Sequence, residues 1–391
     1  MTTSSTIARH PLGWLLLLGA LTSLGPVSID LYLPAFSLIE AELGKGIANT
    51  LAAYMFGVAL GQLFYGPLSD RFGRKPPLYV ALLLYCLGSL GCAMADSMHT
   101  LILCRFLQAL GGCAGVVIAR AIVRDCCEAH EAARVFSTLI LITAVGPIVA
   151  PLVGSVITAA SSWRLLFYGQ AALGLLLLVI MHFALQETAV RGKSLSVRGV
   201  VDTYTALLRE RSFLGHALIG ACVIGMIFCY IASAPTVLMQ SYGLTAQQLA
   251  ALMGLNGMAF VVASQFNLRR LRRHSPSAIL RIAVWVPVIF AAATLLVNFQ
   301  SATYLSLLIG LQLGVFIGAG HISPNAAAEA LAKQGQRAGA ASALLGSVQS
   351  VGSTLAGVVV GLTSAGGVHS MALLMLLFAL AMLAAQHWLA Q

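Results

Sequence analysis

The stretch GPLSDRFGRKP, from Gly66 to Pro76, lies between two long apolar segments and decides the fold class. It combines one acid and three cations with two glycines and a final proline. Gly66 and Gly73 permit a tight turn and close helix approach, and Pro76 suits the first turn of the following helix. A charged loop this short must reverse the chain at a membrane surface. The sequence therefore predicts two membrane helices joined by a short charged loop that holds them together.

Composition supports a membrane protein over the whole chain. The 391 residues are 59% hydrophobic and only 9% charged, with a mean hydropathy of +0.92, whereas a globular protein carries about a quarter charged residues. A helix needs about 20 apolar residues to cross a bilayer, and long continuous runs in lipid are helices. We predict an all-α polytopic membrane protein with twelve transmembrane helices, at 12–35, 49–68, 78–96, 100–121, 135–159, 165–186, 213–238, 246–267, 278–298, 303–326, 339–364 and 369–389.

The longest polar stretch, Gln186 to Ser212, divides the chain into two halves of six helices. Arg269 to Pro276 is a weak echo of Ser69 to Pro76, again a basic turn that ends in proline. The boundaries predicted are an N-terminal bundle at 1–187, a cytoplasmic loop at 188–212 and a C-terminal bundle at 213–391. Two repeated halves with a cleft between them are typical of transporters. The central loop forms either an amphipathic surface helix or a plain linker.

The distribution of Lys and Arg predicts the orientation. With the N-terminus inside, all but three of the 22 cations (Lys45, Arg105 and Arg164) fall on the cytoplasmic side, as the positive-inside rule requires. Both termini are therefore expected in the cytoplasm of a bacterial cell, with the chain in the inner membrane. The net charge of +10 then belongs to a surface that faces anionic lipid, and it does not indicate a nucleic-acid partner.

No motif indicates an enzyme. The eight cysteines form no CxxC or His-spaced pattern, so no metal site is expected. The chain also lacks a GxxxxGK[ST] nucleotide loop, a GxSxG elbow and an HExxH helix. We predict neither catalysis nor a cofactor, and the chain by itself is not an ATP-driven pump.

Four stretches together resemble a known family. They are SIDLYLPAF (28–36), GPLSDRFGRKP (66–76), RFLQALGG (105–112) with ARAIVRD (119–125), and GPIVAPLVG (146–154). The chain resembles the major facilitator superfamily, and within it the Bcr/CflA branch of drug:proton antiporters. The resemblance implies two pseudo-symmetric six-helix bundles and a monomer that exports amphipathic antibiotics, such as chloramphenicol- or bicyclomycin-like compounds, in exchange for protons by alternating access. Export of a metabolite (a purine, sugar or amino acid) by the same fold stays open.

The resemblance gives the charged loop a gating role on the cytoplasmic side. Asp70 should face the N-terminal end of the eleventh helix near Gly339, where a negative charge meets the helix dipole, and Arg74 should pair with Asp125. A simple topology signal would explain the cations but neither Asp70 nor the glycines. The implied gate residues are Gly66, Asp70, Arg71, Gly73, Arg74 and Asp125.

Two charges fall inside predicted spans, where charges usually line a pathway. At about 1.5 Å per residue, Asp30 and Arg105 both lie roughly 7–8 Å from the outer end of their helices. The resemblance makes Asp30 the proton acceptor and Arg105, with Gln108, part of the coupling network. Desolvation raises the pKa of a carboxyl and a nearby guanidinium lowers it, so such an Asp can switch. A static ion pair, or an Asp30 solvated at the outer boundary, remains the alternative.

The fifth span resembles the antiporter motif at Gly146, Pro147, Pro151 and Gly154. Each proline removes a backbone donor and bends a helix. The general motif would have glycines at positions 150 and 151, so packing without any role in antiport is an open alternative. Candidates for the cavity and substrate are Tyr32, Tyr54, Phe56, Gln108, Asn256 and Gln312; Gln265, His321 and Asn325 are further polar positions.

Overall fold

The computed structural model describes residues 12–127, 129–188, 197–298, 304–334, 337–363 and 367–390, and within 129–148 only some side chains. Throughout these ranges the secondary structure is helical, without strands. Eleven helical runs in them are long and apolar enough to cross a membrane. The predicted fifth span coincides with one further helix, α7 (Ala129–Ala160), in which the stretch Val149–Ala160 is apolar. The predicted all-α polytopic fold is confirmed.

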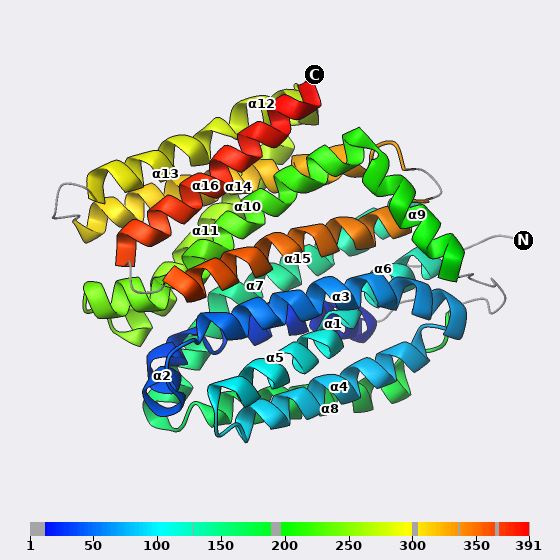
Figure 1. Ribbon diagram of the computed structural model, residues 1–391. Helices are drawn as coiled ribbons and strands as arrows, with labels where there is room; N and C mark the ends of the chain where they lie inside the picture. Colours follow the sequence, from blue (N-terminus) through cyan, green and yellow to red (C-terminus); the bar gives the residue numbers. More distant parts are fainter. Residues whose placement is uncertain are drawn as a thin grey trace, which may run out of the picture.

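The helices alternate in direction along one long axis (Figure 1). The first half contains α1 (Leu12–Asp30), η2 (Leu33–Ala35), α2 (Phe36–Leu43), α3 (Ala48–Phe72), α4 (Lys75–Ala93), α5 (Met98–Gly112), α6 (Ala114–Cys126), α7 and α8 (Arg164–Ala184). The second half contains α9 (Val197–Arg209), α10 (Arg211–Ala234), η3 (Pro235–Ser241), α11 (Ala246–Arg270), α12 (Pro276–Ala283), α13 (Trp285–Asn298), α14 (Leu305–Leu331), α15 (Ala338–Thr363) and α16 (Gly367–Ala390).

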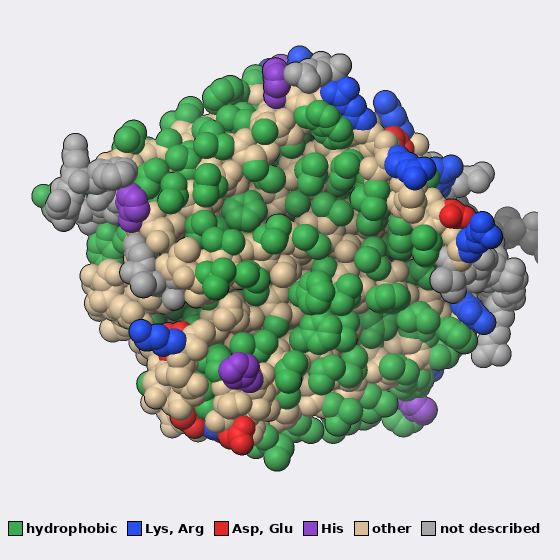
Figure 2. All heavy atoms as spheres, in the orientation of Figure 1, with side chains coloured by type: hydrophobic (Ala, Val, Ile, Leu, Met, Phe, Trp, Pro, Cys, Tyr) green, Lys and Arg blue, Asp and Glu red, His purple; other side chains and the backbone are tan. Residues whose placement is uncertain are grey.

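The surface is divided in the way that a bilayer requires. Figure 2 shows hydrophobic side chains over the middle of the visible face, with Lys and Arg gathered at the right-hand end. We call this the basic end; the loop between α3 and α4 and the helix α9 lie there (Figure 1), and the opposite end is called the far end. An apolar belt between two polar ends is the surface expected of a protein that spans lipid.

The two halves meet along α3 and α15, which lie side by side (Figure 1). Near the middle of both helices, the Ser347 hydroxyl donates to the Ala59 carbonyl at 2.8 Å. Towards the far end, a Cβ added at Gly357 would lie 3.0 Å from Ala52. A second pair, α7 and α11, also joins the halves. The halves are therefore in contact at the middle of the bundle and towards the far end.

The central polar stretch is not a plain linker, because it contains the helix α9 at Val197–Arg209. Tyr204 of α9 donates to the Leu63 carbonyl of α3 at 3.1 Å. Leu207, on the same helix, packs against Leu344 and Leu345 of α15. Of the two alternatives for this stretch, the amphipathic helix is the one formed, and it contacts both halves at the basic end.

Candidate functional site: a buried arginine at a broken helix

The first span is longer than predicted and is broken. Its helical run extends from Leu12 to Leu43 rather than ending at 35. Regular α-helix stops at Asp30, and a short 3₁₀ turn over Leu33–Ala35 follows before α2 begins. Pro34, at the start of that turn, has no N–H to donate, so it interrupts the helix without ending the span. Asp30 therefore lies at the break. Because the helical run continues to Leu43, Asp30 is farther from the outer end of the span than the sequence predicted.

Arg105 of α5 is completely buried and binds the backbone at this break. Its Nη1 donates to the Ser28 carbonyl at 3.1 Å and to Gln108 Oε1 at 2.6 Å. Ser28 lies in the last turn of α1, where carbonyls lack helical partners and the helix dipole is negative. The guanidinium thus caps the broken helix. Its Nε and Nη2 have no hydrogen-bond partner in the described structure.

Two tyrosines hold the Arg105 guanidinium from its faces. The Cζ atom of Arg105 lies 4.3 Å from the ring centre of Tyr32 and 4.2 Å from that of Tyr54. Aromatic faces attract a guanidinium, and most strongly where water is excluded. Tyr32 is itself fixed by a 2.8 Å bond between its hydroxyl and that of Thr50. The sequence predicted both tyrosines as cavity residues, and the structure places them around the arginine.

Hydrogen bonds between amide and hydroxyl side chains extend from Arg105 to the neighbouring helices α4 and α8. Gln108 Nε2 donates to Ser89 Oγ at 2.7 Å and to Gln170 Oε1 at 2.6 Å. On the other side, the Ser28 hydroxyl is bonded to the Tyr85 hydroxyl at 2.7 Å. Sequence reasoning singled out Gln108 but missed its partners. Gln170, a lone amide in the apolar span α8, was the signal that could have revealed them.

Asp30 lies two residues beyond the carbonyl that Arg105 binds, yet the two side chains form no ion pair. The Asp30 residue is 9% exposed, and no hydrogen bond to its carboxyl occurs within the described residues. The similar depth predicted for the two charges agrees with the contact at Ser28. The static ion pair offered as an alternative is not formed, since no salt bridge joins Asp30 to Arg105 within the described residues and Nε and Nη2 of Arg105 have no partner there.

The antiporter-like motif lies on α7, directly against the broken helix. A Cβ at Gly154 would collide with the Leu31 carbonyl, so only glycine allows α7 to approach there. Gly146 lies nearby, where a Cβ would be 3.5 Å from Val27. Pro151 is buried, and the side chain of Pro147 lies outside the described residues. The motif thus packs against the segment of α1 that bears Asp30.

At the basic end, the charged loop forms the expected ion pair. Arg74 Nε donates to Asp125 Oδ2 at 2.8 Å, and its Nη1 donates to Asp70 Oδ1 at 2.6 Å. Burial alone would lower the pKa of Arg74, but the hydrogen bonds to the carboxylates of Asp125 and Asp70 outweigh burial and raise it. Arg71 is exposed and lies over the ring of Phe72.

The loop turns as its glycine predicts, with one partner that was missed. Gly73 has a φ of 94°, a conformation that favours glycine. The Glu187 carboxylate, just after α8, accepts the backbone N–H groups of Arg74 at 2.8 Å and of Lys75 at 3.0 Å. These donors lie at the N-terminus of α4, where an anion is favourable. Gly66 contributes no close approach, since a Cβ there would meet nothing within 4 Å.

The expected contact between Asp70 and the start of α15 is not formed in the described structure. The side chain beside Gly339 is Arg124, whose Nη1 would lie 3.1 Å from a Cβ at that glycine. Arg120 Nη1 also reaches α15, donating to Ser342 Oγ at 3.4 Å. The Asp70 carboxylate pairs instead with Arg74, four residues on and beyond the turn at Gly73. At this end, the cations of α6 therefore make polar contacts with α15.

The candidates of the second half separate into two groups. Asn256 and Gln312 line one pocket together with Tyr230. Nearer the basic end, Asn325 Nδ2 donates to Asn267 Oδ1 at 2.8 Å. His321 is hydrogen-bonded through Nδ1 to the Ile317 carbonyl, and its Nε2 has no partner in the described part of the chain. In the first half, Phe56 lies at the surface, 46% exposed, outside the Arg105 cluster.

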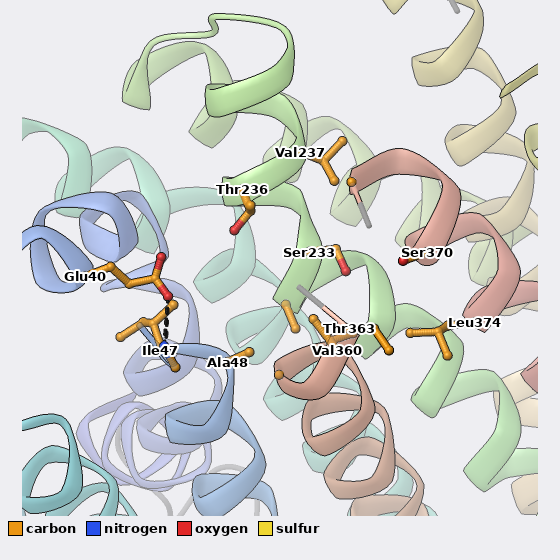
Figure 3. A pocket seen from close by; sticks show the side chains of 14 residues that line it. Glu40, Ile47, Ala48, Ser233, Thr236, Val237, Val360, Thr363, Ser370 and Leu374 are labelled. Atoms are coloured by element: carbon orange, nitrogen blue, oxygen red, sulfur yellow. Dashed lines mark hydrogen bonds between the residues drawn. The ribbon is translucent and has the colours of Figure 1, made fainter. Parts of the chain in front are cut away.

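A second pocket opens between the halves at the far end. Figure 3 shows it between the start of α3, the end of α10 with η3, and the facing ends of α15 and α16. Its polar lining includes Glu40, Ser233, Thr236 and Ser370. The Glu40 carboxylate accepts from the backbone N–H groups of Gly46 and Ile47, before α3. The halves thus enclose space at this end even though α3 and α15 touch.

The comparison with protein families agrees with the geometry. The family model described as Major Facilitator Superfamily matches residues 15–357. The chain belongs to this superfamily. Solved structures of similar fold include a D-xylose-proton symporter (TM-score 0.73, 15% identity, 97% of both chains) and an inward-facing, unoccupied bacterial homologue of the human lysosomal transporter Spinster (TM-score 0.73, 15% identity, 100% of this chain and 96% of that one). At this identity, they show the shared fold.

Curated relatives point to a branch of the superfamily. The chain is 37% identical to the uncharacterized MFS-type transporter YdgK of Bacillus subtilis over 84% of each chain. It is 31% identical to the multidrug resistance protein MdtL of Shigella flexneri (86% and 85%) and 29% identical to a bicyclomycin resistance protein homologue of Haemophilus influenzae (86% and 85%). These relatives group the chain with the Bcr/CflA-type drug transporters. It is a membrane transporter, not an enzyme.

Proposed function

We propose that this protein exports small amphipathic drugs across the bacterial inner membrane in exchange for protons. Bicyclomycin- and chloramphenicol-like antibiotics are the substrates that its relatives suggest. The observation that supports exchange is the pair of buried charges at the break in α1. Asp30 has no bonded partner there, and Arg105 caps the last turn of the same helix (3.1 Å to the Ser28 carbonyl).

Asp30 is the group proposed to take and release the proton. Burying an ionised carboxylate without a partner is costly, so Asp30 can remain in a closed cavity as the neutral acid. When the cavity opens and admits water, the carboxyl can ionise. Arg105 cannot give up its proton, and we propose that its fixed charge near the break favours release from Asp30.

Alternating access would use contacts that the structure contains towards both ends. We propose that the basic end is cytoplasmic, as the positive-inside rule predicts. Opening to the cytoplasm must then break the contacts of Arg120 and Arg124 with α15. The ion pairs of Arg74 lie within the first half, so they would keep that half rigid while it tilts. Opening to the outside would widen the pocket beside Glu40.

The test uses purified protein in liposomes with an imposed pH gradient. The wild type should exchange protons for chloramphenicol, and Asp30→Asn should bind the drug but lose all dependence on the gradient. Asp96→Asn serves as the matched control, because it makes the same replacement at an exposed position between α4 and α5. Gradient-dependent export that survives in Asp30→Asn would remove the proposed proton role. Exchange of protons for a purine, sugar or amino acid, but for no drug, would replace drug export with metabolite export.

A further inference from the structure

The turn between α11 and α12 carries the densest positive charge of the described chain. Four arginines fall within five residues there, and all four are exposed: Arg269, Arg270, Arg272 and Arg273. None of them forms an ion pair within the described residues. The helix α14, which packs against α12, bears one acid, Glu329, and that acid is not paired with them either. No acid of the described structure therefore neutralises these four charges.

The corresponding loop of the first half is neutralised by the protein itself. Arg74 pairs with Asp70 and Asp125. The carboxylate of Glu187 binds backbone N–H groups at the start of α4. At the start of α12, the side chain that caps the helix is the uncharged hydroxyl of Ser275. The two loops thus differ in one component, because the second has cations but no anion, and an anion from outside the protein would complete it.

The turn lies where the apolar surface of the bundle meets the basic end. The helix α11 begins beside η3 at the far end and runs along the bundle, so its last turn is at the basic end (Figure 1). Phe266 and Leu268, at the end of α11, are exposed. Ile282 and Trp285, after the start of α12, are 74% and 54% exposed. The Arg269 Cζ lies 5.2 Å from the ring centre of Phe266, so this charge adjoins the apolar surface directly. Cations in that position lie at the level of lipid head groups.

The chemistry of the turn selects phosphate. A guanidinium binds a phosphate through two parallel hydrogen bonds, and clusters of Lys and Arg beside a membrane helix typically bind anionic lipid. Four charges in so short a segment can neutralise two phosphates, which favours a head group that carries two over one that carries a single phosphate. A soluble acidic partner would leave the exposed side chains of Phe266, Ile282 and Trp285 in water, whereas a lipid covers them.

We propose that the turn between α11 and α12 binds the phosphate groups of an anionic phospholipid in the adjacent leaflet, and that cardiolipin, with its two phosphates, binds best. The apolar side chains of Phe266, Ile282 and Trp285 contact its acyl chains. The lipid gives the second half the anion that Asp125 and Glu187 give the first. The site is separate from Asp30 and Arg105 and does not depend on which substrate is exported or on proton exchange.

Lipid binding to the purified full chain in uncharged detergent tests this site. Cardiolipin and the net-neutral phosphatidylethanolamine are titrated, with native mass spectrometry to measure affinity and thermal unfolding to measure stabilisation, since a ligand of the folded state raises the unfolding temperature. Cardiolipin should bind and stabilise the wild type, and phosphatidylethanolamine should do neither. Arg272→Gln/Arg273→Gln should weaken cardiolipin binding about thirtyfold. Arg198→Gln/Arg209→Gln, the matched control, removes two exposed cations from α9 at the same end and should bind cardiolipin as the wild type does.

Two results of these titrations would overturn the site. Equal weakening in the two double variants would mean that cardiolipin responds only to the total charge of the basic end. Equal affinity for phosphatidylethanolamine would mean that the acyl chains alone are bound.

Hydrogen exchange of the wild type tests the site without any variant, in case the variants insert poorly. Cardiolipin should slow exchange of the backbone amides at 269–275 several-fold and leave those of α9 unchanged, whereas phosphatidylethanolamine should slow neither. No slowing at 269–275, or equal slowing at α9, would overturn the site. Binding of polyglutamate to this turn without any response to cardiolipin would assign it to an acidic protein partner and would overturn the lipid site as well.

Discussion

The two halves of the chain bury different kinds of polar side chain. Three charged residues are buried in the described structure, Asp30, Arg74 and Arg105, and all belong to the first half. The buried amides of the second half are Asn256, Asn267, Gln312, Asn325 and Gln334. Charges inside a membrane protein are costly and usually functional, whereas neutral amides can bond within the bundle at low cost. Among the described residues, buried charge is therefore confined to the first half.

The corresponding loops of the halves differ in the same way. At the start of α4, the carboxylate of Glu187 holds the backbone N–H groups, and Arg74 binds two further acids. At the start of α12, the Ser275 hydroxyl caps the helix alone, accepting from the Ala278 N–H at 3.3 Å. The first loop is tied to the ends of three helices by charge, and the second is a local turn. The two loops are weakly similar in sequence, but they differ in their ion pairs and hydrogen bonds.

The largest expected effect concerns Arg105, the charge with no carboxylate partner. We expect Arg105→Met to reduce gradient-driven export to the level of protein-free liposomes. The unfolding free energy should fall by about 1–3 kcal/mol, since Gln108 Oε1 and the Ser28 carbonyl lose their donor. Export assays and thermal unfolding on the same preparation check this. A large loss of stability would show that Arg105 serves the fold, and full export would show that the first half does not need its charge.

An intermediate effect is expected at the charged loop. Arg74→Ala leaves Asp70 and Asp125 without their cation, so we expect a loss of about 1–3 kcal/mol in unfolding free energy and export reduced about tenfold. Denaturant unfolding and export assays measure the two effects. Arg71→Ala in the same loop and Arg272→Ala in the second half alter exposed cations and should change little. Equal losses in all three variants would remove the contrast between the loops.

The smallest effect is expected from the amide pair of the second half. Asn325→Leu breaks its bond to Asn267 and should lower stability by about 0.6–1.7 kcal/mol, the average and the maximum for such bonds in a membrane bundle, with export within about twofold. The double variant Asn267→Leu/Asn325→Leu should recover part of that stability, because no amide is then left unpaired. Thermal unfolding of the wild type and of the two variants measures these differences in stability. If Asn325→Leu lost as much stability as Arg74→Ala, hydrogen bonds between neutral amides would stabilise the second half as strongly as ion pairs stabilise the first.

Local sequence predicted much of the site. Gly73 and Pro76 behave as their backbone preferences require, and the Arg74–Asp125 pair follows the family pattern. Other features depend on contacts between distant segments. Glu187 binds the start of α4 although it lies 113 residues from Arg74 in the sequence. No short sequence pattern predicts a contact between residues so far apart. The Asp70 contact was misplaced for a local reason, since Arg74, four residues away, binds its carboxylate.

Hydropathy, Lys/Arg distribution and the loop motif depend on single residues and their neighbours, so the amino-acid order alone determined a polytopic helical transporter. The tertiary structure decided which polar groups meet. It put the guanidinium of Arg105 between two tyrosine rings instead of beside an acid, and it buried the amide of Gln312 without a hydrogen-bond partner in the described structure. Such pairings follow from the packing of helices that are remote in the chain, where distances of a few ångströms decide whether a bond forms.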